Sequence, residues 1–131
     1  MNDIKKIGKL GEDAAADHLI KNGYKVIGRN VRVGNKEIDI ICTDNEYIVF
    51  VEVKSKLSDS ITYFSRPSAA IRRDKKNNLI IAAERYVRDN RVPFIPRIDV
   101  IEVYIDESNV KIEHIRSAVT RNDYSSKKRR Y

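Results

Sequence analysis

The sequence is poor in the residues that build disulfides, zinc sites and membrane spans. Its 131 residues include one cysteine, Cys42, which excludes a disulfide within the chain and is typical of a reducing cytosol. The two histidines, His18 and His114, are far apart in the sequence, and with one cysteine they cannot form a conventional structural zinc site. No apolar run is long enough to cross a bilayer, and the first residues lack the apolar stretch of a signal peptide. We therefore expect a cytoplasmic protein with no membrane partner.

Charge, by contrast, is abundant and unevenly distributed. The chain has 34% charged residues and a formal net charge of +7, which suits a polyanionic partner such as DNA. The segment 117–131 carries five basic residues against Asp123, a net charge of +4, so the other 116 residues contribute only +3. We expect one domain over residues 1–116, because 41% hydrophobic residues suffice for a single core. The basic tail, residues 117–131, has almost no apolar content and is predicted to be disordered.

Hydrophobic periodicity predicts one helix, three strands, a second helix and two further strands. Apolar residues recur at helical spacing over residues 4–22 and 68–90. Runs rich in β-branched residues predict strands over 24–29, 37–41, 49–54, 97–105 and 110–115. Polar residues predict a connection over 30–36 and a loop over 55–66. This order is typical of an α/β fold, with a mixed five-stranded sheet flanked by two main helices and the second helix as a crossover.

Two of these strands carry charge where a buried strand normally carries apolar residues. Asp39 lies in the strand 37–41, and Glu52 and Lys54 lie in the strand 49–54. Isolated charge in a packed sheet is costly unless it is paired or bound to a metal ion. Isoleucine and valine crowd both faces of these strands, which indicates a sheet covered on both sides. The three residues therefore predict a metal site that cleaves phosphodiesters, although a solvent-facing edge hairpin would produce the same pattern.

The length of the turn between these strands controls whether the two acids meet. A two-residue turn at Asp44-Asn45 would place Asp39 opposite Phe50, and would make Asp39 and Glu52 diagonal neighbours about 7 Å apart. An even-length turn keeps Asp39, Glu52 and the lysine on one face. An odd-length turn would invert one strand and destroy the site.

Glu12 is a candidate further member of the site. It borders the apolar stripe of the first helix, and small residues lie one turn away on either side, so its carboxylate would be able to lean inward. On pattern alone, an ordinary exposed helix glutamate is the simpler interpretation.

A series of short motifs, taken in order, resembles the YraN family of bacterial proteins. The motifs are Gly8-x-x-Gly11-Glu12-x-x-Ala15, Gly23-Tyr24, Arg29-Asn30-x-Arg32, the two acidic strands, Pro67-x-Ala69-Ala70-Ile71 and Arg97-Ile98-Asp99-Val100. The resemblance covers roughly residues 4–105. It implies a restriction-endonuclease-like α/β/α core of the PD-(D/E)xK type, similar to the archaeal Holliday junction resolvases.

The resemblance also implies roles for individual residues. Asp39 corresponds to the acid of the first motif, Glu52 and Lys54 to the second motif, and Glu12 and Lys75 to a glutamate and a lysine on helices. In the nuclease hypothesis that follows, Asp39, Glu52, the Val53 carbonyl and Glu12 hold Mg²⁺ or Mn²⁺, and Lys54 orients the attacking water or stabilises the transition state.

Several basic residues are candidate phosphate contacts, which position a nucleic acid without reading its sequence. They are Arg29, Arg32, Arg72, Arg73, Lys75 and Lys76, each of which is also, by itself, an ordinary solvated charge. The leading hypothesis is a metal-dependent DNA endonuclease, with branched and single-stranded DNA as candidate substrates and a homodimer by analogy with junction-cleaving enzymes. The alternatives are a DNA-binding module without turnover, and an adaptor whose basic tail docks an acidic protein or RNA.

Overall fold

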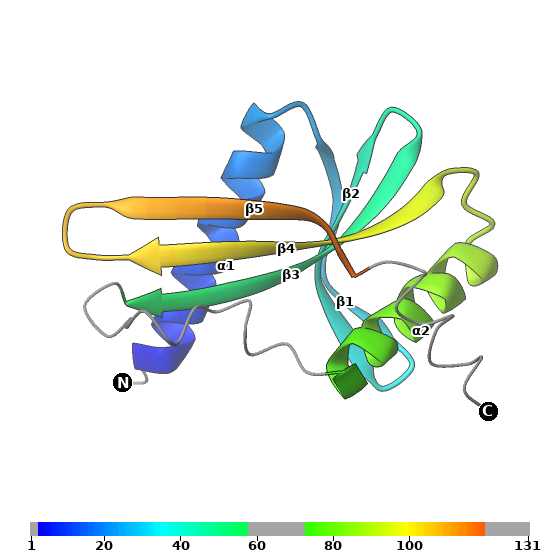
Figure 1. Cartoon of the computed structure of the whole chain (residues 1–131), viewed down its shortest axis with the longest axis horizontal. Coiled ribbons are helices and arrows are strands. Elements are labelled where there is room, and N and C mark those ends of the chain that lie inside the picture. The colour runs from blue at the N-terminus through cyan, green and yellow to red at the C-terminus, as the bar shows by residue number, and fades with distance from the viewer. Residues whose placement is uncertain (1–2, 58–72, 120–131) are drawn as a thin grey trace.

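The elements of the structure follow the predicted order (Figure 1). A computed structural model describes residues 3–57 and 73–119. The helices are α1 (Asp3–Lys21) and α2 (Arg73–Asp89), and the strands are β1 (Lys25–Val33), β2 (Lys36–Asp44), β3 (Tyr47–Leu57), β4 (Ile95–Ile105) and β5 (Val110–Val119). The predicted α/β class, with a mixed five-stranded sheet and two helices, is confirmed. Neither helix, as far as the chain is described, is long and apolar enough to span a membrane.

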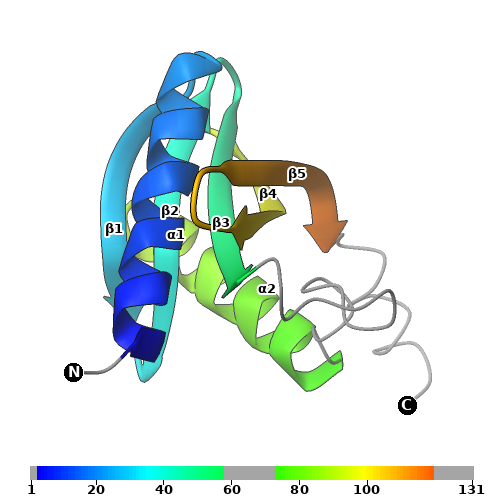
Figure 2. The ribbon, with the colours of Figure 1, turned by 90° about the vertical axis from the view of Figure 1, so that its left-hand side faces the viewer.

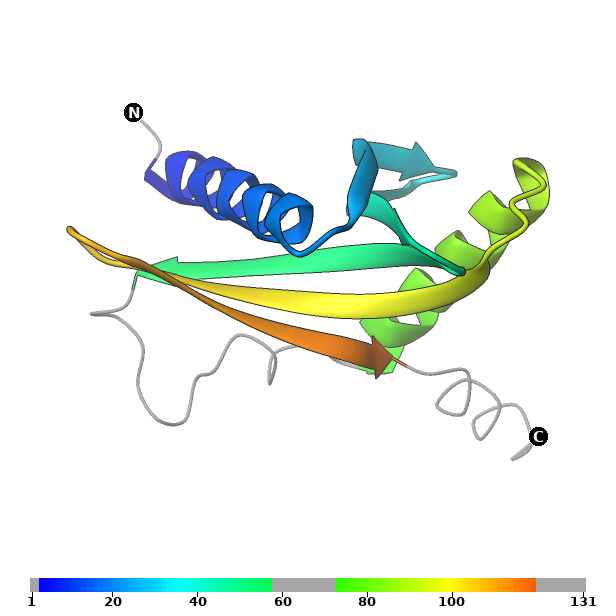
Figure 3. The same cartoon turned by 90° about the horizontal axis from the view of Figure 1, so that it is seen from above.

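The five strands lie in the sheet in the same order as in the chain. Strands β3 and β4 are parallel, and every other neighbouring pair is antiparallel. A parallel pair needs a long connection, and α2 lies within it, as the periodicity predicted. Helices α1 and α2 lie on opposite sides of the sheet (Figures 2 and 3).

Each helix covers its own apolar layer. The layer under α1 includes these buried side chains from the helix and from three strands: Ala15, Leu19, Ile40, Val51 and Ile101. The layer under α2 is built in the same way: Leu79, Ala83, Ile41, Phe50 and Ile98. Neighbouring residues of β2 and β3 therefore alternate between the two layers, so the sheet is covered on both sides, as its crowding with isoleucine and valine predicted.

The strands run further than their composition predicted, most clearly β1, β3 and β5, because backbone pairing continues through polar residues. Strand β1 reaches Val33, within the predicted connection, and Gly34 (φ 64°) then makes the turn into β2. Strand β3 continues to Leu57, within the predicted loop, because its pairing with β4 extends that far. Strand β5 continues to Val119, which pairs with Ile98 and lies within the predicted tail.

Residues 58–72 and 120–131 lie outside the described residues. They contain most of the predicted loop 55–66, the start of the predicted second helix and most of the basic tail. The division into a domain over 1–116 and a disordered tail therefore stays a prediction.

Gly11 brings α1 into direct contact with β3. A Cβ atom at position 11 would lie 1.8 Å from the Oγ atom and 2.7 Å from the Cβ atom of Ser55. Both distances are far shorter than a van der Waals contact, so only glycine allows this approach. Because Glu12 is the next residue along the helix, the contact also fixes how close Glu12 lies to the sheet.

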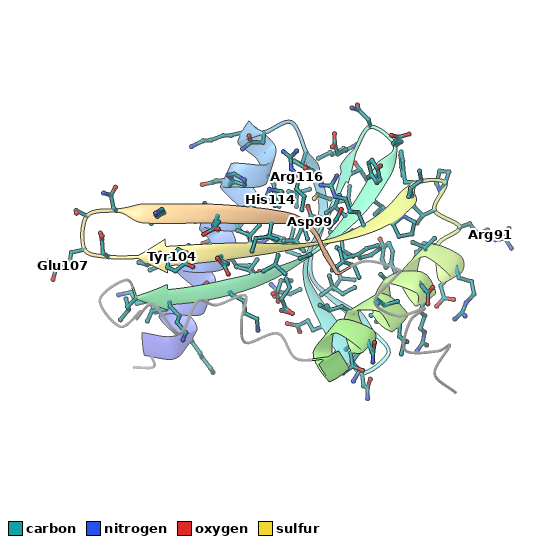
Figure 4. The ribbon with its side chains drawn as sticks, viewed as in Figure 1. Arg91, Asp99, Tyr104, Glu107, His114 and Arg116 are labelled. Atoms are coloured by element: carbon teal, nitrogen blue, oxygen red, sulfur yellow. The ribbon has the colours of Figure 1, made fainter. Side chains whose placement is uncertain are left out.

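Asp99 is the centre of a buried polar cluster on the α1 side of the sheet (Figure 4). Its carboxylate accepts hydrogen bonds from Arg97 (2.8 and 2.9 Å) and from the Ser117 N–H (3.0 Å), and lies 2.7 Å from Nε2 of His114. Burial acts to raise the pKa of Asp99, but the hydrogen bonds from His114, Arg97 and Ser117 together lower it. Arg97 also donates to the Tyr24 hydroxyl at 2.7 Å. The cluster therefore joins β4 to β5 and to the start of β1.

We expect Gly11→Ala to lower the free energy of unfolding by about 1–3 kcal/mol, because the added methyl group overpacks the contact with Ser55. Gly8→Ala is the matched control, since a Cβ atom there meets nothing within 4 Å. Adding Ser55→Gly to Gly11→Ala should restore stability. Urea denaturation measures all of these variants, and a Gly11→Ala protein as stable as the wild type would contradict the contact.

We expect Asp99→Asn to cost about 3–5 kcal/mol of unfolding free energy, because it leaves the half-buried Arg97 without its counter-charge. Asp17→Asn, on the exposed side of α1, should change stability by less than about 0.5 kcal/mol. The same denaturation assay compares the two variants. Equal effects would show that the Asp99 cluster does not stabilise the fold.

Candidate functional site

The first hairpin crosses from one face of the sheet to the other at Asn30 and Asp39. Asn30 has a left-handed backbone conformation (φ 52°). The register of the β1–β2 backbone pairs on either side of it places Asn30 opposite Asp39. Ile38 packs in the layer under α2, whereas Ile40 packs in the layer under α1. Residues two positions apart in a regular strand point to the same face of the sheet. Because Ile38 and Ile40 point to opposite faces, β2 is irregular between them. Figure 3 shows β1 bending sharply over the sheet.

At this bend, a side chain of β2 takes the place of a main-chain acceptor. The backbone pairing of β2 with β3 extends only as far as Ile40 and Val51. Beyond that point, the Val53 N–H donates a hydrogen bond of 2.8 Å to Oδ2 of Asp39. Continuing the register by one residue places Asp39 opposite Glu52, so the two acids come together.

The turn of the β2–β3 hairpin lies one residue later than predicted, at residues 45–46. The predicted pairing of Asp39 with Phe50 is therefore wrong, since Phe50 pairs with Ile41. The asparagine of the turn adopts a φ of 47°, which asparagine tolerates better than most residues, and this sets the position of the turn. Because the turn still has an even length, Asp39 and Glu52 meet, directly opposite rather than diagonally.

Burial beside Glu52 disfavours the charged form of Asp39. The pKa of Asp39 is raised to about 7, first by burial and then by the charge of Glu52, while the hydrogen bond from the Val53 N–H acts against the shift. The charge of Glu12 adds a smaller increase. Glu52 is itself only 7% exposed. Two carboxylates that share a buried site favour protonation of one of them.

Glu12, on α1, lies close enough for its charge to act on Asp39. Its Oε1 atom accepts hydrogen bonds from Nδ2 of Asn30 at 2.9 Å and from Nη2 of Arg29 at 3.3 Å. Arg29 also forms an ion pair of 2.7 Å with Asp13. The side chain of Glu12 is 17% exposed, so it is a half-buried residue held by β1 and not a freely solvated helix glutamate.

Lys54 has a buried acid as its neighbour on the adjacent strand. The parallel register places Glu102 of β4 beside Lys54. Glu102 is fully buried, and the Tyr104 hydroxyl donates to it at 3.0 Å. Sequence reasoning missed Glu102, although an acid between two buried apolar residues of a predicted strand is the same signal that identified Glu52.

Asn30 and the Asp99 cluster were missed as well. Both lie in motifs that carried the family resemblance, but the sequence alone assigned them no partner. The left-handed conformation of Asn30 and the pairing of Asp99 with His114 depend on contacts between distant segments.

The predicted phosphate contacts are only partly described. Arg29 is 37% exposed and is paired with Glu12 and Asp13, and Arg32 is exposed on β1 at the edge of the sheet. Arg72 and the side chains of Arg73, Lys75 and Lys76 lie outside the described residues. Over residues 3–57 and 73–119, no group of three or more histidines, cysteines and acids could hold a metal ion. The structure thus assembles two acids, Asp39 and Glu52, with Glu12 nearby in contact with basic and amide groups.

The fold and the site define an α/β protein with a mixed sheet and a pair of buried acids at a hairpin bend. The model of the uncharacterised protein family UPF0102 matches residues 11–103. The UPF0102 protein BF0634 of Bacteroides fragilis is 38% identical over 118 residues, covering 90% of this chain and 95% of the relative. A UPF0102 protein of Clostridium beijerinckii is 37% identical over 121 residues, covering 90% and 96%. The chain belongs to the UPF0102 family, which is the YraN family of the resemblance.

We expect the contribution of Asp39 to the stability of the metal-free protein to fall as the pH rises from about 4 to about 7. The pKa of Asp39 is higher in the folded protein than its ordinary value of 3.8, so the folded state holds the proton more tightly in that range. Asp39→Asn cannot ionise but still offers an acceptor to the Val53 N–H. It should be more stable than the wild type by about 1–3 kcal/mol at pH 8, and similar to it near pH 4.

Urea unfolding in the presence of EDTA measures this difference at each pH. Asp44→Asn, in the same strand, is the control and should behave like the wild type. A stability difference between Asp39→Asn and the wild type that is the same at pH 4 and pH 8 would contradict the assignment.

Proposed function

We propose that the protein is a Mg²⁺- or Mn²⁺-dependent endonuclease that hydrolyses phosphodiester bonds of DNA. The observation that carries this proposal is the placement of Asp39 against Glu52, with the pKa of Asp39 raised to about 7 by burial and by its neighbour. Acids that face each other lower the stability of the fold, and they are characteristic of sites that bind a cation or transfer a proton.

The donor atoms suit a hard divalent cation. The carboxylates of Asp39 and Glu52 and the carbonyl of Val53 are all oxygen ligands, which Mg²⁺ and Mn²⁺ prefer. When bound, such a cation supplies an acidified water and neutralises charge on the phosphate. Because oxygen donors come from two strands joined by a short hairpin, their spacing is set by the sheet and not by a mobile loop.

The other residues of the site have separate roles in this proposal. The Val53 N–H holds the Asp39 carboxylate in place. Lys54, on the strand that carries Glu52, orients the attacking water or stabilises the transition state. Arg32 on β1 contacts the DNA backbone, which positions the substrate without reading its sequence. The proposal includes a cytoplasmic location, and a homodimer that presents one site to each of two strands.

A second candidate is a DNA-binding module that keeps the nuclease fold without turnover. One observation favours it: Glu12 is already bonded to Arg29 and Asn30, and no third acid completes a metal-binding group in the part of the chain that is described. In this alternative, DNA binding persists when either acid of the site is removed.

We expect Asp39→Ala and Glu52→Ala each to reduce DNA cleavage by at least about 100-fold, because each removes a charged cation ligand. Cleavage of branched, single-stranded and duplex DNA is measured with Mn²⁺ and with Mg²⁺. Glu46→Ala, at the exposed tip of the β2–β3 turn, is the control and should leave the rate unchanged.

Equal cleavage by the wild type and both site variants would rule out this site as the catalytic centre. Binding of DNA by the wild type, with no cleavage of any of these substrates, would favour the second candidate.

A further inference from the structure

A row of polar side chains connects the half-exposed surface of α1 to the buried Asp99. Nε2 of His18, on α1, lies 3.3 Å from Nδ1 of His114 on β5. Nε2 of His114 lies 2.7 Å from Oδ2 of Asp99 on β4 (Figure 4). At the outer end, the amide nitrogen of Asn22 lies 3.4 Å from Nδ1 of His18. The two imidazoles therefore join the C-terminal end of α1 to β5.

The partners of the two imidazoles assign one hydrogen to each of them. The ionised carboxylate of Asp99 only accepts hydrogen bonds, so Nε2 of His114 carries a hydrogen. Nδ1 of a neutral His114 then accepts a hydrogen bond from Nε2 of His18. This leaves Nδ1 of His18 as an acceptor, which suits the Asn22 amide because an NH₂ group only donates. Every contact in the row is satisfied when both histidines are neutral.

Added protons disturb this row in a fixed order. While the two imidazoles keep their hydrogen bond, one extra proton on either of them places a hydrogen on Nδ1 of His18, where it faces the Asn22 amide. A second extra proton leaves an N–H of His18 facing an N–H of His114. The hydrogen bond between α1 and β5 is then lost, and two positive charges meet.

The groups around the two imidazoles do not compensate for added positive charge. The charge of Asp99 is already balanced by Arg97, and Arg116 of β5 brings a further positive charge. Asp17 and Lys21, which are exposed on the same helix as the outer imidazole, have opposite charges. The other ionisable side chains near the cluster are two phenols and a thiol, which bring no charge at acidic pH: Tyr24 of β1, Tyr47 of β3 and Cys42 of β2.

We propose that the His18–His114 pair is a pH-sensitive contact, which holds the end of α1 on β5 while both imidazoles are neutral and releases it when both are protonated. This proposal is independent of the proposed function. The pKa of His18 supports it, because that pKa is lowered from its ordinary value of 6.5, first by burial and then by the charges of His114 and Arg116. The folded protein therefore binds this proton less tightly than the unfolded chain, and stability is lost as the pH falls below about 6.5.

NMR spectra that correlate the ring nitrogens of histidine with the ring hydrogens test the assignment of hydrogens. The chain has two histidines, and His18→Gln identifies the signals of each. At pH 8 we expect both His18 and His114 to carry their hydrogen on Nε2 and none on Nδ1. A hydrogen on Nδ1 of His18 at this pH would overturn the proposal.

Urea unfolding between pH 8 and pH 5 tests the sensitivity to acid. The full chain with Asp39→Asn is the reference, because Asp39 would otherwise titrate in this range with the opposite sign. We expect its urea midpoint to fall as the pH is lowered, and His18→Gln to remove most of the fall. Glutamine does not titrate, and its amide can donate to or accept from His114. Lys21→Gln, on the same helix, is the control and should leave the fall unchanged. A fall of equal size with and without His18→Gln, or no fall in the reference, would overturn the proposal.

Amide hydrogen exchange distinguishes the release of α1 from a uniform loss of stability. In the Asp39→Asn protein, the protection of residues 15–21 should fall between pH 8 and pH 5 by more than the protection of α2. Adding His18→Gln should remove this difference between the helices. Equal losses of protection in α1 and α2 would show that no local contact is released, and would overturn the proposal.

Discussion

The hydrogen bond from the Val53 N–H to the Asp39 carboxylate marks the point where β2 leaves β3, and the site depends on it. A strand amide in a packed sheet must find an acceptor, and here a side chain supplies one where the regular pairing stops. The hairpin is therefore free to change face without leaving that amide unpaired. The same change of face lets β1 and β2 contribute to both apolar layers and brings Asp39 against Glu52.

Buried charge is treated in two different ways in this protein. On the α1 side of the sheet, Asp99 is surrounded by Arg97, His114 and a backbone N–H, so its charge is balanced within the fold. At the hairpin bend, Asp39 lies against another acid, which lowers the stability of the fold when Asp39 is ionised. The first arrangement joins strands together, whereas the second places two acids side by side, which is characteristic of functional sites.

The part of the candidate site that depends on the residue pattern within a single strand could be predicted from the sequence. Acids within apolar strands identified Asp39 and Glu52, and an even turn was enough to bring them together even though its position was wrong by one residue. Glu102 carried the same signal and was overlooked. The left-handed conformation of Asn30 was beyond prediction, because nothing near it in the sequence indicates such a residue in the middle of a strand. The ends of β1, β3 and β5 were also missed, because pairing with a neighbouring strand overrides the polar composition at those ends.

The order of the elements, the two-sided sheet and the residue types of the site all follow from periodicity and composition, which are properties of short segments. The meeting of Glu12, Asn30 and Asp39 has another origin. It requires the close approach of α1 at Gly11, the bend of the first hairpin and the register of the second. Each of these is a relation between segments that are distant in the chain, and the alternation of apolar and polar residues within one segment carries no information about the distance to another. The acids could therefore be named from the sequence, but their positions relative to one another were decided only by the folded chain.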